Sequence, residues 1–191
     1  LLVATRGTRG VQRVSVDGGP LTQVTTLDAS RGELFHLYPQ FLPDGRHFIY
    51  QSQTSIRDNW AIFVGSIDSM DRRNLVQSEY ARFAAPHLLL YTQGGNLVAR
   101  TLDLRTQELT GQPVVIADGI ASLPDNGRAG FSVSDTGVLV YKKTEEQGPV
   151  ERELTWIDRR GNVLEVVGPR VTSTSMRLSP DGARVALTER A

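Results

Sequence analysis

Short apolar or alternating segments, rather than helical repeats, dominate the pattern of hydrophobic and polar positions along the chain. These segments are rich in Val, Ile, Thr, Phe and Tyr, and Gly, Asp, Asn and Pro separate them. Such a pattern is typical of β-strands joined by tight turns. It predicts strands at 48–51, 61–66, 88–92, 97–102, 114–117, 137–141, 154–157 and 185–188. We therefore expect an all-β fold.

One kind of turn recurs along the chain. Pro43-Asp44-Gly45 precedes the strand at 48–51, and Pro180-Asp181-Gly182 precedes the strand at 185–188. Ser134-Asp135-Thr136-Gly137 is a weaker copy of the same turn. Pro presets φ at the first corner, Asp bonds back to the backbone, and Gly supplies the positive φ that closes the turn. The spacing of the turn glycines indicates a repeat of about 45 residues.

Each repeat is predicted to hold four strands, which is typical of one blade of a β-propeller. A further copy, with its turn degraded, is expected at 83–87. About four blades are represented, in approximate units 1–30 (partial), 31–80, 81–122, 123–172 and 173–191 (partial). A β-sandwich is the alternative for the same strands, but its turns would not recur at a fixed period.

Both ends of the chain lie within apolar runs, at 1–4 and 184–188. The first and last strands are each expected to be the second strand of their unit, so they overlap and do not complete one another. We therefore expect a partial ring, taken from a longer protein. An open ring exposes an apolar face and free sheet edges, which favour self-association.

Several longer segments carry a family resemblance. They are 38–48 (YPQFLPDGRHF), 109–114 (LTGQPV), 131–134 (FSVS) and 154–161 (LTWIDRRG). With the recurring turn, they resemble the WD40-like (PD40) repeats of TolB-like β-propellers. They look most like the C-terminal propeller of bacterial eukaryotic-type serine/threonine protein kinases.

The resemblance implies a non-catalytic binding or scaffold module. On this reading the chain is the extracytoplasmic, or periplasmic, sensor or protein-interaction domain of a bacterial serine/threonine kinase. Two alternatives stay open. One is the accessory propeller that gates substrate to a prolyl-oligopeptidase-like peptidase domain, and the other is a free-standing periplasmic TolB-like protein.

Composition narrows the choice of partner. The 191 residues contain 21 Lys and Arg and 21 Asp and Glu, so the net charge is +0. The chain therefore lacks the excess of positive charge that is typical of nucleic-acid-binding proteins, and we expect no nucleic-acid partner. No apolar run reaches the length of a membrane helix, so this segment is expected to make no direct membrane contact. The chain has no cysteine, which removes thiolate metal sites and cysteine nucleophiles. We expect a protein or peptide partner.

Catalytic motifs are missing from the sequence. The Gly-rich loop, His-Arg-Asp and Asp-Phe-Gly motifs of a kinase do not occur, and the nearest approach to Gly-x-Ser-x-Gly, at Ser66, lacks the second glycine. His36, His47 and His87 are too widely spaced for a local zinc pair. We therefore expect no enzyme activity, no metal and no cofactor.

Two sets of polar residues recur at the repeat period. Seven aspartates stand at turns, where each is expected to bond to its own backbone: Asp17, Asp44, Asp68, Asp103, Asp135, Asp158 and Asp181. Five residues before each hairpin glycine lie Gln40, Ser132 and Arg177, beside apolar neighbours. These three positions are equivalent in the repeats but carry side chains of different chemistry, which suggests a binding surface whose lining varies from blade to blade. The three residues are therefore the candidate partner-binding residues. The alternative is that they form hydrogen bonds between blades.

Overall fold

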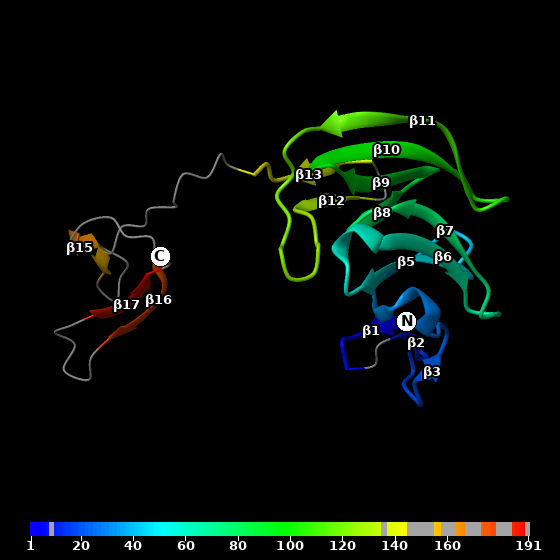
Figure 1. Cartoon of the computed structure of the whole chain (residues 1–191), viewed down its shortest axis with the longest axis horizontal. Coiled ribbons are helices and arrows are strands. Elements are labelled where there is room, and N and C mark those ends of the chain that lie inside the picture. Colours follow the sequence, from blue (N-terminus) through cyan, green and yellow to red (C-terminus); the bar gives the residue numbers. More distant parts are fainter. Residues whose placement is uncertain are drawn as a thin grey trace. The chain divides into compact units, whose positions relative to one another are not determined.

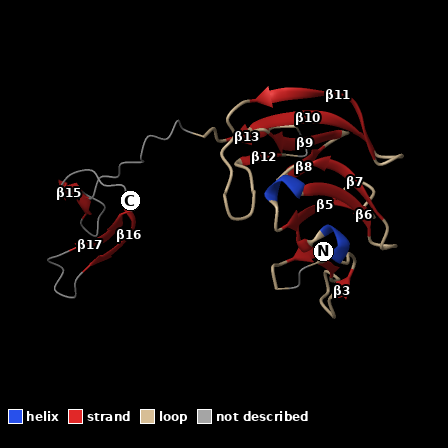
Figure 2. Cartoon of the chain, in the orientation of Figure 1, coloured by secondary structure: helices blue, strands red, loops and turns tan. Residues whose placement is uncertain are grey.

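The computed structural model describes residues 1–7, 10–134, 137–144, 155–157, 163–166, 173–178 and 185–189. The chain divides into two compact units, Leu1–Thr144 and Glu145–Ala191, and each is described by itself. Nearly all regular structure in the described residues is β-strand, interrupted by two single helical turns, η1 (Ala29–Arg31) and η2 (Arg57–Asn59) (Figure 2). The all-β class predicted from the sequence is confirmed. No helix among the described residues has the length and apolar character needed to span a membrane.

The described residues of the first unit form four antiparallel sheets (Figure 1). Their strands are β1 (Leu2–Ala4), β2 (Val11–Arg13), β3 (Thr22–Gln23), β4 (Glu33–Phe41), β5 (His47–Thr54), β6 (Ala61–Ser66), β7 (Arg72–Gln77), β8 (Ala81–Ala84), β9 (Leu88–Gln93), β10 (Asn96–Asp103), β11 (Glu108–Ala117), β12 (Phe131–Val133) and β13 (Leu139–Tyr141). The sheets are β1–β3, β4–β7, β8–β11 and β12–β13, and within each every strand pairs with the next one along the chain. Short connections therefore suffice throughout the two four-stranded sheets.

Buried apolar side chains join each sheet to the next. Phe48, Tyr50 and Phe63 of the β4–β7 sheet pack with Val11 and Val24 beside the first sheet. On the other face of β4–β7, a second cluster reaches the β8–β11 sheet: Leu42, Ile49, Ile62, Val64, Ala81, Phe83, Leu89, Tyr91, Val98 and Leu102. A third joins β8–β11 to β12: Tyr80, Ala84, Leu90, Leu97, Ala99, Ala117, Ile120, Ala129 and Phe131. The sheets thus form successive layers in chain order (Figure 1).

This layering explains the sequence of the central strands. Seven of the eight residues of β5 and five of the six residues of β6 are buried. A strand covered on both faces needs a nearly continuous run of buried residues in place of alternation. Gly65 of β6 lies so close to the rings of Phe48 and Tyr50 that an added Cβ would sit 3.3 Å from each.

The recurring turn has the predicted construction where the structure describes it. Gly45 has φ 65°, and its N–H donates to the carbonyl oxygen of Leu42. Asp44 Oδ1 accepts hydrogen bonds from the backbone N–H groups of Arg46 and His47, each at 2.9 Å. The predicted turn-stabilising role of Asp44 is confirmed.

The other turn aspartates divide into two kinds. Asp103 Oδ1 also accepts from its own turn, from the N–H groups of Arg105 and Thr106. At Asp17 and Asp68 the serine two residues earlier accepts the N–H of the aspartate instead. The remaining three, Asp135, Asp158 and Asp181, lie outside the described residues.

The second unit contains two hairpins in its described residues. They pair β14 (Thr155–Ile157) with β15 (Val163–Val166), and β16 (Ser173–Leu178) with β17 (Val185–Glu189), both antiparallel. The strands predicted at 154–157 and 185–188 therefore occur, with residue 154 outside the described set.

Candidate functional site: an arginine and tyrosine face

A row of aromatic rings connects the first strands of three successive sheets. Tyr38 of β4 meets Tyr80, which directly precedes β8, edge to face with ring centroids 5.3 Å apart. Tyr80 in turn meets Phe131 of β12, also at 5.3 Å and edge to face. Edge-to-face pairs at this separation are favourable beyond the area that they bury. The row therefore fixes these three strands relative to one another.

Tyr38 stands at an irregularity in β4. The pairing of β4 with β5 matches Leu37 to Gln51 and Gln40 to Ile49, so β4 carries one extra residue between these points. Tyr38 itself has φ 54°, a left-handed conformation that is unfavourable for a tyrosine. Bulges redirect side chains, and strained backbone is found preferentially at functional sites. This geometry makes Tyr38 the starting point for the candidate site.

Three arginines surround the aromatic row. Arg82 of β8 donates from Nε to the hydroxyl of Tyr80 at 2.9 Å, and its guanidinium carbon lies 5.5 Å from the Tyr80 ring centroid. Arg6 lies near the row as well as 5.4 Å from the ring centroid of Phe35 on β4. Arg128 directly precedes Ala129, which packs in the same apolar cluster as Tyr38, Tyr80 and Phe131. Burial raises the pKa of Tyr38, whereas the charges of Arg128 and Arg6 act to lower it. We call Arg6, Tyr38, Tyr80, Arg82 and Arg128 the arginine–tyrosine face.

The segment 118–130, which follows β11, brings Arg128 to this face. Arg57 Nη1 donates to the carbonyl oxygen of Pro124 at 2.7 Å, and Gln53 Nε2 to that of Asn126 at 3.0 Å. Gly127 packs against Trp60 with φ 71°, and a Cβ there would lie 2.9 Å from the indole ring. Backbone carbonyls of the 118–130 segment and the close packing of Gly127 therefore help to hold this segment against the β4–β7 sheet.

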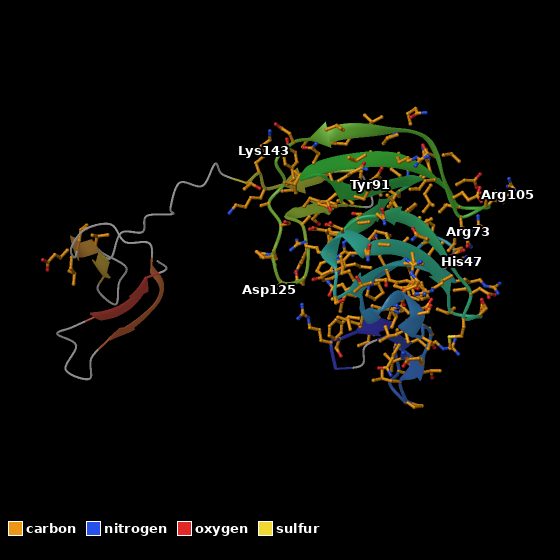
Figure 3. The ribbon with its side chains drawn as sticks, viewed as in Figure 1. His47, Arg73, Tyr91, Arg105, Asp125 and Lys143 are labelled. Carbon is orange, nitrogen blue, oxygen red and sulfur yellow. The ribbon has the colours of Figure 1, made fainter. Side chains whose placement is uncertain are left out.

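Arg6 is tied to the same segment. Its Nη2 donates to the carbonyl oxygen of Asp125 at 2.7 Å, and Asp125 lies at the end of the unit opposite to His47, Arg73 and Arg105 (Figure 3). The N-terminal residues, β8 and the 118–130 segment therefore each contribute one arginine to the face.

The arginines of this face lack carboxylate partners in the described part of the chain. Five other arginines are matched with carboxylates, in the pairs Arg31–Glu33, Arg46–Asp68, Arg57–Glu79, Arg72–Glu33 and Arg73–Glu108. No described Asp or Glu forms an ion pair with Arg6, Arg82 or Arg128. Three further arginines also lack an acidic partner among the described residues, but they belong to other elements: Arg13 to β2, Arg100 to β10 and Arg105 to the turn after β10. The arginine–tyrosine face thus concentrates positive charge that the described residues leave uncompensated.

A cavity of about 550 Å³ adjoins the face at Arg128. Ser132, Tyr141 and Lys142 also line it, and Ser132 is exposed. Its lining contains the cations Arg128 and Lys142, hydroxyl groups and apolar side chains, with no acidic residue among those described. The cavity extends the positive character of the face toward β12 and β13.

The three sequence-predicted site residues have different surroundings. Gln40 uses its amide to join two sheets: Nε2 donates to the carbonyl oxygen of Phe83 at 3.1 Å, and Oε1 accepts from Phe83 N–H at 2.9 Å. Ser132 lies on β12 in the cavity just described. Arg177 lies on β16 in the second unit, and its side chain is outside the described set. Gln40 and Ser132 therefore lie in different surroundings within the first unit, and the position of the Arg177 side chain is not described.

Sequence reasoning missed Tyr38, Arg82 and Arg128. Tyr80 and Arg82 are two residues apart, the spacing that places side chains on one face of an extended segment, so this pair carried a usable signal. Tyr38 and Arg128 carried none, because their positions depend on a strand register and on the course of the 118–130 segment.

A second polar cluster has a different character. Glu33 Oε2 lies 3.0 Å from His36 Nε2, and His36 Nδ1 lies 2.8 Å from Thr25 Oγ1. The order carboxylate, imidazole, hydroxyl is that of a catalytic triad, but all three residues are buried. Arg72 Nη1 lies 2.8 Å from both carboxylate oxygens of Glu33. We call Thr25, Asp28, Glu33, His36 and Arg72 the Glu33 cluster. Because its carboxylate, imidazole and hydroxyl groups are buried, the cluster serves to anchor η1 and β4.

Burial acts to raise the pKa of Glu33, but hydrogen bonds from His36 and Arg72 outweigh it and hold that pKa well below its usual value. The carboxylate is therefore charged at neutral pH, and its charge is balanced by Arg72.

A second cavity, of about 420 Å³, lies between the end of β7 and the β9–β10 turn. Its wall includes Arg57 and Glu79, whose Nη2 and Oε2 atoms are 2.6 Å apart. The hydrogen bonds that Arg57 donates to Glu79 raise the pKa of Arg57, and the Glu79 carboxylate already balances the charge of this cation. Among the described residues, no group of three or more His, Asp or Glu side chains is placed to hold a metal ion.

No protein-family model matches the chain, and no curated protein matches it.

Proposed function

We propose that this chain is a non-catalytic binding module, built as a partial β-propeller, and that the arginine–tyrosine face is where its partner binds. The observation that carries the proposal is Tyr38. A left-handed tyrosine in a bulged strand costs about 1–3 kcal/mol, and backbone strain of this kind clusters at binding and active sites.

Two features support the propeller. The two four-stranded sheets are both simple meanders, and they follow one another as layers in chain order. Their first strands, β4 and β8, meet through Tyr38 and Tyr80, as the inner strands of neighbouring blades would. The repeat in the sequence predicts a further four-stranded unit over 123–172, and the described residues of this range contain the separate hairpins β12–β13 and β14–β15. The repeat of about 45 residues distinguishes it from a β-sandwich.

The family resemblance supplies the biological setting of the proposal. It favours an extracytoplasmic sensor or interaction domain of a bacterial serine/threonine kinase. An accessory propeller of a prolyl-oligopeptidase-like enzyme and a free-standing periplasmic TolB-like protein are the alternatives. A kinase domain and membrane helix encoded upstream, a Gly-x-Ser-x-Gly domain downstream, or a signal peptide with neither would separate these three.

Self-association belongs to the same proposal. The edge strand β11 exposes Val114, Val115 and Ile116, whereas β7, the corresponding edge of the preceding sheet, begins with Arg72 and Arg73. Charged residues on an edge oppose pairing with another chain, and an apolar edge lacks this protection. Light scattering on the chain, over a range of concentrations, measures whether this edge associates.

The test of the binding role is selection from a displayed library of random peptides on the immobilised full chain. Peptides that are retained should lose binding when Tyr38 is replaced by Gly, which tolerates the left-handed backbone while removing the ring. A matched control is Leu104→Gly, which removes an exposed side chain in the turn after β10. Failure to enrich any peptide, or equal loss with both variants, would contradict the proposal.

A further inference from the structure

Charge at the candidate site specifies the chemistry of the partner. Arg6, Arg82 and Arg128 are three cations from separate segments of the chain, and no described carboxylate pairs with them. Arg82 and Arg6 spend donors on neutral acceptors, the Tyr80 hydroxyl and the Asp125 carbonyl. Guanidinium groups form their strongest hydrogen bonds with anionic oxygens, so an anionic partner would gain more here than a neutral one.

The surroundings of the cations indicate the size of that partner. Arg128 adjoins Ala129, which packs in the same cluster as Tyr38, and it also lines the cavity of about 550 Å³ to which Lys142 contributes. Positively charged groups therefore extend from the arginine–tyrosine face, through Arg128, into the cavity. A single small anion would engage only part of this arrangement, whereas an extended chain with several carboxylates could engage all of it.

Aromatic and hydroxyl groups accompany the charges. Tyr38 and Phe35 are each partly exposed beside the arginines, and Ser132 and Tyr141 line the cavity. Side chains of this kind supply apolar contact and hydrogen bonds to a peptide, and Tyr and Arg are enriched where binding energy is concentrated. Nucleic acid is disfavoured, because the chain has net charge +0 and shows no long basic stripe.

We infer that the arginine–tyrosine face, together with the adjoining cavity, binds an acidic peptide segment, with carboxylates accepted by Arg82, Arg128 and Lys142. This inference rests on the proposed binding function and adds the chemical class of the partner. The carboxylates complete ion pairs that the described residues leave unmade, and the aromatic rings hold the intervening peptide.

The experiment is a fluorescence-anisotropy titration of the full chain with a labelled peptide of alternating Gly and Glu. A peptide of the same length with Gln in place of Glu measures the contribution of charge. The acidic peptide should bind at least about tenfold more tightly than the amide peptide, and its binding should weaken as salt is added. Inorganic phosphate and a short single-stranded oligonucleotide serve as competitors. Neither should displace the acidic peptide when it is added at the same total concentration of negative charge.

Two charge-matched double variants locate the binding. Arg82→Gln with Arg128→Gln should weaken the acidic peptide about tenfold or more, whereas Arg46→Gln with Arg73→Gln, which removes the same charge from paired positions, should change it less than about twofold. Arg128→Gln alone is included because Arg128 is exposed, so that the fold is retained even if the loss of Arg82 disturbs Tyr80. It should weaken binding about threefold or more.

Each other outcome overturns the inference in a recognisable way. Equal binding of both peptides, lost in the Arg82 and Arg128 variant, would refute the acidic partner and leave the binding function standing. Equal loss in the two double variants would refute the site. Tighter binding of the oligonucleotide would assign the charge to nucleic acid. No binding of the acidic peptide would refute the inference, and the peptide selection described above would then decide the function separately.

Discussion

The Glu33 cluster and the arginine–tyrosine face use the same side chain in opposite ways. In the Glu33 cluster, Arg72 reaches both oxygens of a fully buried carboxylate and also contacts Asp28. In the arginine–tyrosine face, Arg82 and Arg128 have no acidic partner among the described residues. A charge that is balanced within the fold helps to hold the fold together, and a charge left unbalanced at the surface is free to attract a partner.

The largest expected effect comes from breaking the balanced charge. Replacing Arg72 with Met leaves the Glu33 carboxylate buried without its cation, which should lower the free energy of unfolding by about 3 kcal/mol or more. Arg73→Met, one residue along β7, removes a guanidinium from the exposed pair with Glu108 and should cost less than about 1 kcal/mol. Urea denaturation of both variants measures the difference. Equal costs would show that the Glu33 cluster contributes no more than a surface pair.

Acid should weaken the same cluster. The pKa of Glu33 is lowered in the folded protein from the ordinary value of 4.5, so its contribution to stability is fully present above pH 4.5 and is lost as the pH falls toward the folded value. Below pH 4.5 this group should remove at most about 1.4 kcal/mol per pH unit. Urea midpoints at neutral pH and at pH steps below 5 give the slope.

Glu33→Gln is the matched variant for this prediction, since it keeps the shape of the side chain without its titration. Its stability should fall less steeply in acid than that of the original chain. Parallel slopes would assign the acid sensitivity to other carboxyl groups, among which Asp44 also has a lowered pKa.

Two glycines of the 118–130 segment, Gly127 and Gly119, can be compared to test how the position of Arg128 is fixed. Gly127→Ala would place a methyl group 2.9 Å from Trp60, so the segment must shift and carry Arg128 away from Tyr38. Gly119→Ala is matched to it, because Gly119 also has positive φ but no atom lies within 4 Å of an added Cβ. Each should lose about 1 kcal/mol of stability from backbone strain.

Only Gly127→Ala should also weaken binding of the acidic peptide, by about threefold or more. Anisotropy titrations of the two variants, alongside their thermal melts, separate the two effects. If Gly119→Ala impaired binding equally, the packing of Gly127 on Trp60 would not be what positions the site.

The sequence predicted several elements of the fold, but it did not predict the candidate site. Strand 61–66 coincides with β6, and Pro43-Asp44-Gly45 forms the expected turn, because alternation, apolar runs and turn residues act locally. The site depends on longer-range facts. Tyr38 is redirected by one extra residue in a strand pairing, which the sequence does not reveal.

Arg128 illustrates the same limit. It is positioned by backbone carbonyls of residues 124 and 126, which accept side-chain donors from the β4–β7 sheet and its loops. Any residue type offers such a carbonyl, so no sequence motif marks the contact. Gln40 was a candidate binding residue because of its place five residues before a turn glycine, but the structure shows its amide bound to Phe83. The role of Gln40 as a bond between neighbouring sheets was the alternative weighed from the sequence.

The smallest expected effect on stability is that of replacing an arginine of the arginine–tyrosine face. Arg128→Gln should change the free energy of unfolding by less than about 0.5 kcal/mol, because an exposed arginine without an acidic partner contributes little to the fold. Urea denaturation beside Arg72→Met measures it. A loss as large as that of Arg72→Met would show that Arg128 is structural after all.

The most direct test of the central claim is to map where an acidic peptide touches the chain. A Gly-Glu peptide carrying a photoreactive group is cross-linked to the full chain, and the attachment points are identified by mass spectrometry. We predict attachment to β4 near Tyr38, to β8 and to the 118–130 segment. Attachment concentrated at the opposite turns, around residues 42–46, 67–71 and 104–107, would contradict the assignment of the arginine–tyrosine face as the binding site.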